Sequence, residues 1–298
     1  MIEHITDRLF SAAPQSTLYH YSTLPGVLGI VSSGELRASD IRYMNDSAEL
    51  RHTLDILRDY ITRRVLAGSD NPELLKELLE WLSHRIVSGR MVFGASFRAN
   101  GNLLSQWRGY SVHGKGVSLG FNPKRILECA RRQQFQVGKC VYEPAEQTAL
   151  MEQLVDALEA RASQAEPPLQ AEPPLEEGVS PCKWHRLFEE IEGDLLRIAA
   201  VLKHPSFEEE QEWRIVSPVL SRSENRLVRF REGTFMLVPY YAFDLGSGDE
   251  KGMELDHVYL GPTSNIELSM NSLELFLSQH NVLPRRGISY CDIPYRQR

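Results

Sequence analysis

Two short segments, far apart in the chain, carry the residue types best suited to chemistry. The first is the run LYHYST at 18–23, which places the imidazole of His20 beside two hydroxyls on a short predicted strand. The second is the acidic run FEEEQEWRIV at 207–216, in which Glu210 and Glu212 stand two residues apart. Residues two apart in a strand point to the same face, so both carboxylates are expected to enter one cleft. Two carboxylates in one cleft repel each other unless a cation lies between them.

The composition is that of an ordinary globular protein. Of 298 residues, 42% are hydrophobic and 24% are charged, and we expect a single domain over residues 1–298. The formal net charge is −7, which argues against a dedicated duplex-DNA binder while leaving room for a local basic cleft.

Cysteine and histidine spacing disfavours a structural or catalytic metal. The four cysteines form no C-x-x-C pair and are expected to be free thiols, and the nine histidines show no H-x-H or H-E-x-x-H spacing. No apolar run reaches the ~18 residues of a membrane helix, and the first residues lack the pattern of a signal peptide. We therefore expect a cytoplasmic protein without a membrane partner.

Helical and extended patterns alternate irregularly along the chain, which favours an α+β fold. Helices are expected at 24–33, 48–66, 72–87, 122–134, 147–162, 183–203 and 264–279, with a helical turn at 103–107. Strands are expected at 18–21, 36–39, 91–97, 117–119, 137–142, 212–217, 226–231, 234–238, 257–260 and 288–291. The hexapeptide QAEPPL occurs twice in tandem at 164–175, and its prolines predict a flexible surface insertion at about 163–181.

Several blocks together resemble the bacterial domain-of-unknown-function family 2971. The matching blocks, which keep one order across nearly the whole chain, are LYHYS at 18–22, GELRASD at 34–40, NDSAE at 45–49, LSQWRGY at 104–110, GVSLGF at 116–121, EQEWR at 210–214, LGP at 260–262 and IPYR at 293–296.

This family in turn resembles the ADP-ribosyltransferase superfamily, whose members use NAD as a substrate. The strand ending in His-x-Ser/Thr, followed by a helix and a Gly-x-Leu turn, is similar to the opening of poly-ADP-ribose polymerases and DNA-modifying toxins. The Glu-x-Glu is similar to the catalytic strand of arginine-modifying relatives. The resemblance implies split antiparallel sheets around a cleft, with helical insertions.

The resemblance also assigns roles to the two opening segments. Glu212 is the first candidate for the carboxylate that stabilises the ribosyl cation formed when NAD loses nicotinamide. Glu210 is the candidate for the group that orients or deprotonates the acceptor. The assignment of these two roles can be reversed. His20 would bind ribose hydroxyls, supported by Ser22 or Thr23. In the structural alternative, residues 207–212 are a solvated acidic segment that precedes an edge strand, and His20 only packs against its neighbours.

Further cofactor-binding candidates follow from the same resemblance. They are Tyr19 and Tyr21 beside the His, Ser105, Trp107 and Arg108 in one short run, Ser118 in the glycine-flanked strand, and Arg214 after the acidic pair. Arg108 would clamp the pyrophosphate, and Trp107 or Tyr110 would stack on nicotinamide. The alternatives are core packing for Tyr21 and Trp107, and neutralisation of the acidic run for Arg214, Lys203 and Arg296.

The sequence leaves the acceptor open among protein, nucleic acid and nucleotide. A toxin or anti-phage defence effector is an expected role, with an antitoxin or defence-system protein as partner. Two alternatives stay beside the transferase: an NAD hydrolase, in which water is the acceptor, and a non-catalytic nucleotide-sensing module in which the carboxylates form structural ion pairs.

Overall fold

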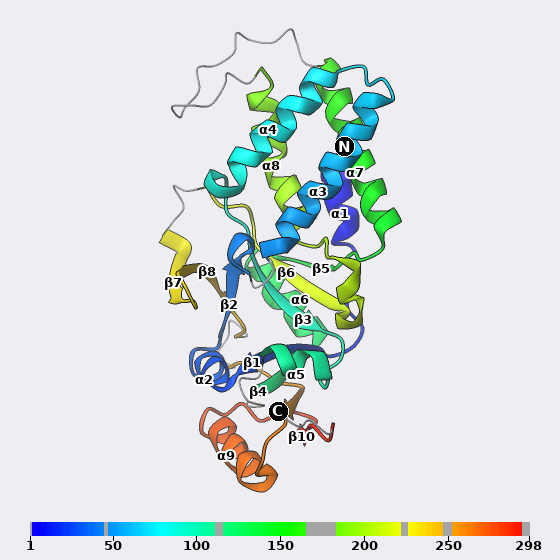
Figure 1. The fold of residues 1–298 in the computed structure, drawn as a ribbon. Helices are drawn as coiled ribbons and strands as arrows, with labels where there is room; N and C mark the ends of the chain where they lie inside the picture. The colour runs from blue at the N-terminus through cyan, green and yellow to red at the C-terminus, as the bar shows by residue number, and fades with distance from the viewer. Residues whose placement is uncertain are drawn as a thin grey trace.

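The computed structural model describes residues 2–44, 47–110, 116–164, 183–221, 226–246 and 252–293. It confirms a mixed α+β architecture, in which a helical bundle stands at one end of a twisted sheet (Figure 1). No helix in these ranges combines the length and apolar character needed to cross a membrane. Cys129, Cys140 and Cys291 are buried free thiols, as expected.

The described strands form one connected sheet of ten. Eight of them follow the order β10-β9-β4-β1-β3-β2-β8-β7, and β5 and β6 extend from β3. The strands are β1 (Leu18–Thr23), β2 (Glu35–Asp40), β3 (Phe93–Arg98), β4 (Gly116–Phe121), β5 (Gln136–Lys139), β6 (Glu212–Val216), β7 (Val228–Glu232), β8 (Leu237–Asp244), β9 (His257–Leu260) and β10 (Ile288–Tyr290).

The helices fall into two groups with separate hydrophobic cores. One group packs around buried leucines, isoleucines and aromatic rings away from the sheet: α1 (Ile2–Leu9), α3 (Ser47–Leu66), α4 (Pro72–Ser88), α7 (Pro144–Gln164) and α8 (His185–Ala199). The other group contributes to the core that includes the sheet: α2 (Leu24–Ser33), α6 (Pro123–Arg132) and α9 (Ile266–Gln279). A short helix, α5 (Leu104–Tyr110), lies against β1.

Strand β3 pairs with three other strands, one along one edge and two along the other. Along the first edge, β3 pairs with β6 from Gly94 to Arg98. Along the other edge its first two residues pair with β2, and only Arg98 pairs with β1. The middle of this second edge is therefore left without a paired strand, because β1 and β2 diverge from it. This opening lies within one continuous sheet of the described strands.

Local sequence signals determine helix α2, which connects β1 to β2. Thr23 caps α2 by accepting a hydrogen bond from the Gly26 amide, and Pro25 lies in the first turn, where its missing N–H costs nothing. Gly34 ends the helix with φ 67°, in the left-handed region that glycine adopts without strain. The helix observed at Leu24–Ser33 has the predicted bounds, so β1 leads through one helix directly to β2.

Two further elements differ from the sequence expectations. Helix α1 (Ile2–Leu9) was not predicted, although it buries Ile2 and Ile5 in the core of the helical bundle. The strand expected at 234–238 is instead β8, which begins at Leu237 and continues to Asp244, where it pairs with both β2 and β7. The insertion expected at 163–181 lies outside the described residues, apart from the end of α7 at Gln164. The block at 294–296 also lies outside them.

Candidate functional site

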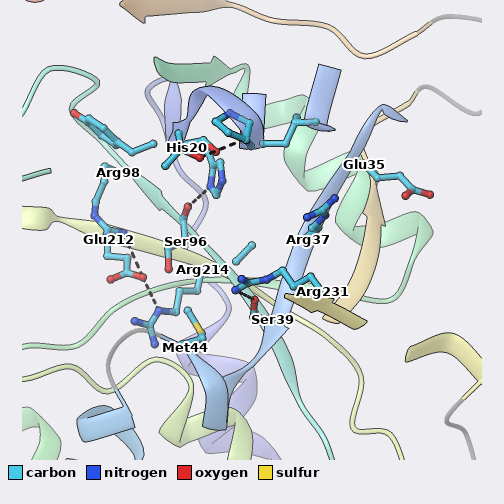
Figure 2. Close-up of a pocket in the computed structure, with 18 of the residues that line it drawn as sticks. His20, Glu35, Arg37, Ser39, Met44, Ser96, Arg98, Glu212, Arg214 and Arg231 are labelled. Atoms are coloured by element: carbon cyan, nitrogen blue, oxygen red, sulfur yellow. Dashed lines mark hydrogen bonds and ion pairs between the residues drawn. The ribbon is translucent and has the colours of Figure 1, made fainter. Parts of the chain in front are cut away.

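A cavity of about 440 Å³ opens where β1 and β2 diverge. Its volume falls within the range of small-molecule sites, roughly 300–1,000 Å³. Strands β1, β2, β3, β6 and β7 and the start of α2 supply its walls (Figure 2). Its charged and polar lining residues are His20, Tyr21, Ser22, Thr23, Glu35, Arg37, Ser39, Ser96, Arg98, Lys203, Glu212, Arg214 and Arg231.

His20 is fixed on the free edge of β3. Its Nδ1 lies 2.9 Å from the carbonyl oxygen of Ser96, which can only accept, so Nδ1 carries the proton. Burial lowers the pKa of His20, the bond to Ser96 partly opposes this, and the charge of Arg98 lowers the pKa further. The neutral imidazole is therefore left with Nε2 as a hydrogen-bond acceptor, which suits a sugar hydroxyl.

A five-residue ion cluster forms the opposite end of the site. Lys203 Nζ contacts carboxylate oxygens of both Glu210, at 2.6 Å, and Glu212. Arg98 contacts the same two residues, at 2.6 Å and 3.3 Å. The Nε–H of Arg214 donates to Glu212 at 2.6 Å, and its Nη1 donates to the carbonyl of Ala200 at 2.9 Å. Three cations thus surround two carboxylates, which leaves the cluster net positive.

Glu212 is the centre of this cluster. Its side chain is 0% exposed, against 14% for Glu210. Burial raises the pKa of Glu212, but the charges of Arg214, Arg98 and Lys203 outweigh burial and hold the pKa well below its ordinary value. The carboxylate is therefore ionised at neutral pH although it has no contact with bulk water.

The spacing argument for Glu210 and Glu212 was wrong in its geometry. Glu210 ends a 3₁₀ helix (η2, Pro205–Glu210), and Gln211 has φ 42°, so the strand begins only at Glu212. The two carboxylates converge because the left-handed turn at Gln211 folds one back toward the other, and both bind Lys203 and Arg98. The cation that their repulsion requires is supplied by the protein itself.

Four predicted site residues border the cavity beside the acidic cluster. Tyr21, Ser22 and Thr23 line it together with His20, and Arg214 lines it from β6. The hydroxyl of Thr23 also caps α2, and the Tyr21 hydroxyl donates to the Asn100 carbonyl at 2.9 Å. These bonds show a structural use for both groups. Glu210 does not line the cavity and reaches it only through Lys203 and Arg98.

Trp107 and Ser118 lie outside the cavity lining. Trp107 is buried in α5, where its Nε1–H donates to Asn102 at 2.8 Å and its ring packs edge-on against Tyr21. This is the core-packing alternative. Ser118 is buried on β4, and its hydroxyl has no hydrogen-bond partner among the described residues.

Three more candidates are also absent from the cavity lining. Ser105 and Arg108 are exposed on α5. Tyr19 points to the other side of β1, where its hydroxyl lies 3.2 Å from His257 Nδ1 and it lines a separate hollow of about 30 Å³ that also borders His20.

Sequence reasoning missed three arginines of the site. Arg98 is the last residue of the largely apolar strand β3 and is 4% exposed. A charged residue at the end of an apolar strand was the sequence signal that could have identified it. Arg37 and Arg231 come from β2 and β7, which are joined only through β8. No local pattern relates these two positions, and only the strand order brings them to one wall.

Residues 106–215 match the family described as "Protein of unknown function (DUF2971)", over somewhat more than a third of the chain. This confirms the family resemblance read from the sequence blocks. No curated protein and no solved structure matches the chain.

Proposed function

Since the description of the family that residues 106–215 match assigns no activity, we propose a function from the cavity itself. We propose that the cavity binds NAD and that the protein transfers ADP-ribose to a second molecule. The observation that carries this proposal is the shared cavity of His20 and Glu212, which come from opposite parts of the chain. The superfamily resemblance led us to expect split antiparallel sheets around a cleft, and we include that ADP-ribosyltransferase-like fold in the proposal.

In the proposed reaction the bond between ribose C1′ and the nicotinamide nitrogen breaks, and its electron pair leaves with neutral nicotinamide. The positive charge that develops on the ribosyl ring is stabilised by an anionic carboxylate near the 2′-hydroxyl. Glu212 suits this role because its neighbouring cations keep it ionised. A nucleophile then bonds to C1′ and loses its proton to solvent, because Glu210, the base that the resemblance suggested, does not line the cavity.

His20 has a separate part in this proposal. Its Nε2 would accept a hydrogen bond from a ribose hydroxyl, while the Nδ1–H bond to Ser96 fixes the ring. The charge excess of the cluster and of Arg37 and Arg231 favours an anionic ligand such as a dinucleotide. Each of these features supports substrate binding, and only the carboxylates bear on bond cleavage.

The enclosure of Glu212 favours a second candidate, a nucleotide-binding module without catalysis. Among the described residues, the carboxylate of Glu212 contacts three cations, Arg98, Lys203 and Arg214. In this reading the carboxylate is the counter-ion of a buried cation cluster, and the cavity senses a nucleotide without cleaving it.

The experiment measures nicotinamide release from NAD by the purified full chain, with Glu212→Gln, Glu210→Gln and His20→Asn as variants. The transferase proposal expects Glu212→Gln to lower the rate by about a hundred- to thousand-fold while NAD still binds. Glu254→Gln is the control, because Glu254 forms an exposed 2.6 Å pair with Arg285. Thermal unfolding of each variant separates lost catalysis from lost folding, and Glu210→Gln tests the less buried carboxylate.

The products and binding data separate the candidates. Free ADP-ribose without a modified acceptor supports the hydrolase, and a labelled acceptor supports the transferase. NAD binding without nicotinamide release, together with unchanged intracellular NAD on expression of the protein, supports the binding module. Absence of NAD binding by the folded wild type contradicts all three.

A further inference from the structure

Two arginines face the cavity from the wall opposite the Glu212 cluster. Arg37 comes from β2 and Arg231 from β7, and both line the cavity. Strand β8 lies between their strands, with Arg37 opposite Ala242 and Arg231 opposite Val238. In Figure 2 both side chains extend toward the same open space, across from Arg98 and Glu212.

These two arginines differ from the other cations of the site in having no acidic partner. Arg98, Lys203 and Arg214 are each paired with Glu212, whereas neither Arg37 nor Arg231 forms an ion pair with any described residue. Glu35, which lines the cavity from β2, has its carboxylate bound by Arg229 at 2.8 Å. The positive charge available to a ligand is therefore concentrated on this wall.

Both guanidinium groups are also held in place by neutral contacts. Arg37 stacks over the ring of Tyr240 at 5.5 Å, and Arg231 Nη2 donates to the Ser39 hydroxyl at 3.2 Å. Burial lowers the pKa of Arg231, and the charge of Arg37 lowers it further. Two fixed like charges in one cavity are unfavourable by themselves, and an anion bound between them relieves that repulsion.

We propose that Arg37 and Arg231 form a phosphate-binding subsite of the cavity, with Ser39 as a third polar contact. This inference rests on the proposed function, because it assigns the diphosphate of the substrate to the wall formed by β2 and β7. Guanidinium groups suit phosphate because their planar N–H donors match two phosphate oxygens at once. The sugar would then lie toward His20, and the cavity would distinguish phosphorylated nucleotides from nucleosides.

The test measures binding of inorganic pyrophosphate, ADP and adenosine to the full chain by titration calorimetry. The wild type is expected to bind ADP more tightly than adenosine, and to bind pyrophosphate. Arg37→Gln and Arg231→Gln are each expected to weaken ADP and pyrophosphate binding by about tenfold, because each removes a charged donor, and to leave adenosine binding unchanged.

Arg132→Gln is the matched control, since it removes one positive charge from an arginine that is paired with Asp244 outside the cavity lining. It should leave all three affinities unchanged. Arg231→Lys keeps the charge but loses the planar fork, and is expected to recover part of the affinity lost in Arg231→Gln. Both glutamine variants should remain folded, because each loses one neutral contact, to Tyr240 or to Ser39, and no ion pair.

The outcomes also separate this inference from the proposed function. Loss of pyrophosphate binding in the arginine variants, with no NAD cleavage by the wild type, supports the subsite and removes the enzymatic function. NAD cleavage with the same KM in Arg37→Gln, Arg231→Gln and wild type overturns the subsite and leaves the function standing. Equal weakening of adenosine and ADP, or no weakening of either, also overturns the subsite.

Discussion

Replacing Glu212 by Gln tests the central feature of the site, the buried ion cluster. The substitution keeps the size of the side chain and removes one of the two negative charges that face Arg98, Lys203 and Arg214. We expect it to be strongly destabilising even in the absence of ligand, because three cations would then share only the charge of Glu210.

The magnitude follows from burial. The side chains of Glu212, Lys203 and Arg214 are 0%, 2% and 3% exposed, so water cannot replace the lost carboxylate. Removing one partner of a buried ion pair typically costs about 3–5 kcal/mol, whereas an exposed pair contributes about 0–1 kcal/mol. Glu254 and Arg285 supply the exposed reference, with the same 2.6 Å separation as Glu212 and Arg214 but side chains 37% and 62% exposed.

The cost should depend on pH in a defined direction. The pKa of Glu212 in the folded protein lies well below its value in the unfolded chain, because Arg214, Arg98 and Lys203 outweigh the effect of burial. A depressed carboxylate pKa stabilises the fold above the unfolded pKa, about 4.3, and this stabilisation is lost as the pH falls from there toward the folded pKa. The difference between wild type and Glu212→Gln should therefore be full at pH 7 and smaller at about pH 3.5.

Urea unfolding of the wild type, Glu212→Gln and Glu254→Gln over this pH range gives the required free energies. We expect Glu212→Gln to cost several times more than Glu254→Gln at neutral pH. Equal costs for the two variants, or a Glu212→Gln cost that does not shrink in acid, would refute the reasoning that an ionised, enclosed carboxylate holds the cluster together.

Three further predictions concern the neighbouring residues. In a double-mutant cycle of Glu212→Gln with Lys203→Met, the double variant should be more stable than the sum of the single losses allows, because it removes both charges of one buried pair; additive free energies would contradict this. Burial lowers the pKa of His20, so the wild type should lose stability as the pH falls below about 6.5, and His20→Asn should lose less; urea unfolding at pH 7 and pH 5 measures the difference. Trp107→Phe should cost about 1–3 kcal/mol of unfolding free energy by removing the bond to Asn102, without changing pyrophosphate affinity in calorimetry.

The elements that local signals specify could be predicted from the sequence. Helix α2 has the expected bounds, because Thr23, Pro25 and Gly34 provide a cap, a first-turn proline and a left-handed stop within twelve residues of chain. The repulsion between Glu210 and Glu212 was predicted from a strand geometry that the structure does not have, but the residue types alone indicated that two carboxylates brought together need a cation. The sequence thus predicted the need for a cation at this pair, but not the turn at Gln211 that brings the two carboxylates together.

The tertiary structure decided which cations pair with Glu210 and Glu212. Arg98 reaches Glu212 because antiparallel pairing of β3 with β6 places the two residues opposite each other, and that register depends on contacts far apart in sequence. Lys203 arrives from the segment after α8.

The same holds for the cavity. The residues of β1 and β2 specify two strands and a connecting helix, but not that the strands leave one edge of β3 at different points. The wall formed by Arg37 and Arg231 likewise exists because β8 pairs with both β2 and β7. Residue type and local spacing therefore determined which groups can do chemistry, and long-range strand pairing decided which of them meet, because side-chain convergence across a sheet depends on register and strand order.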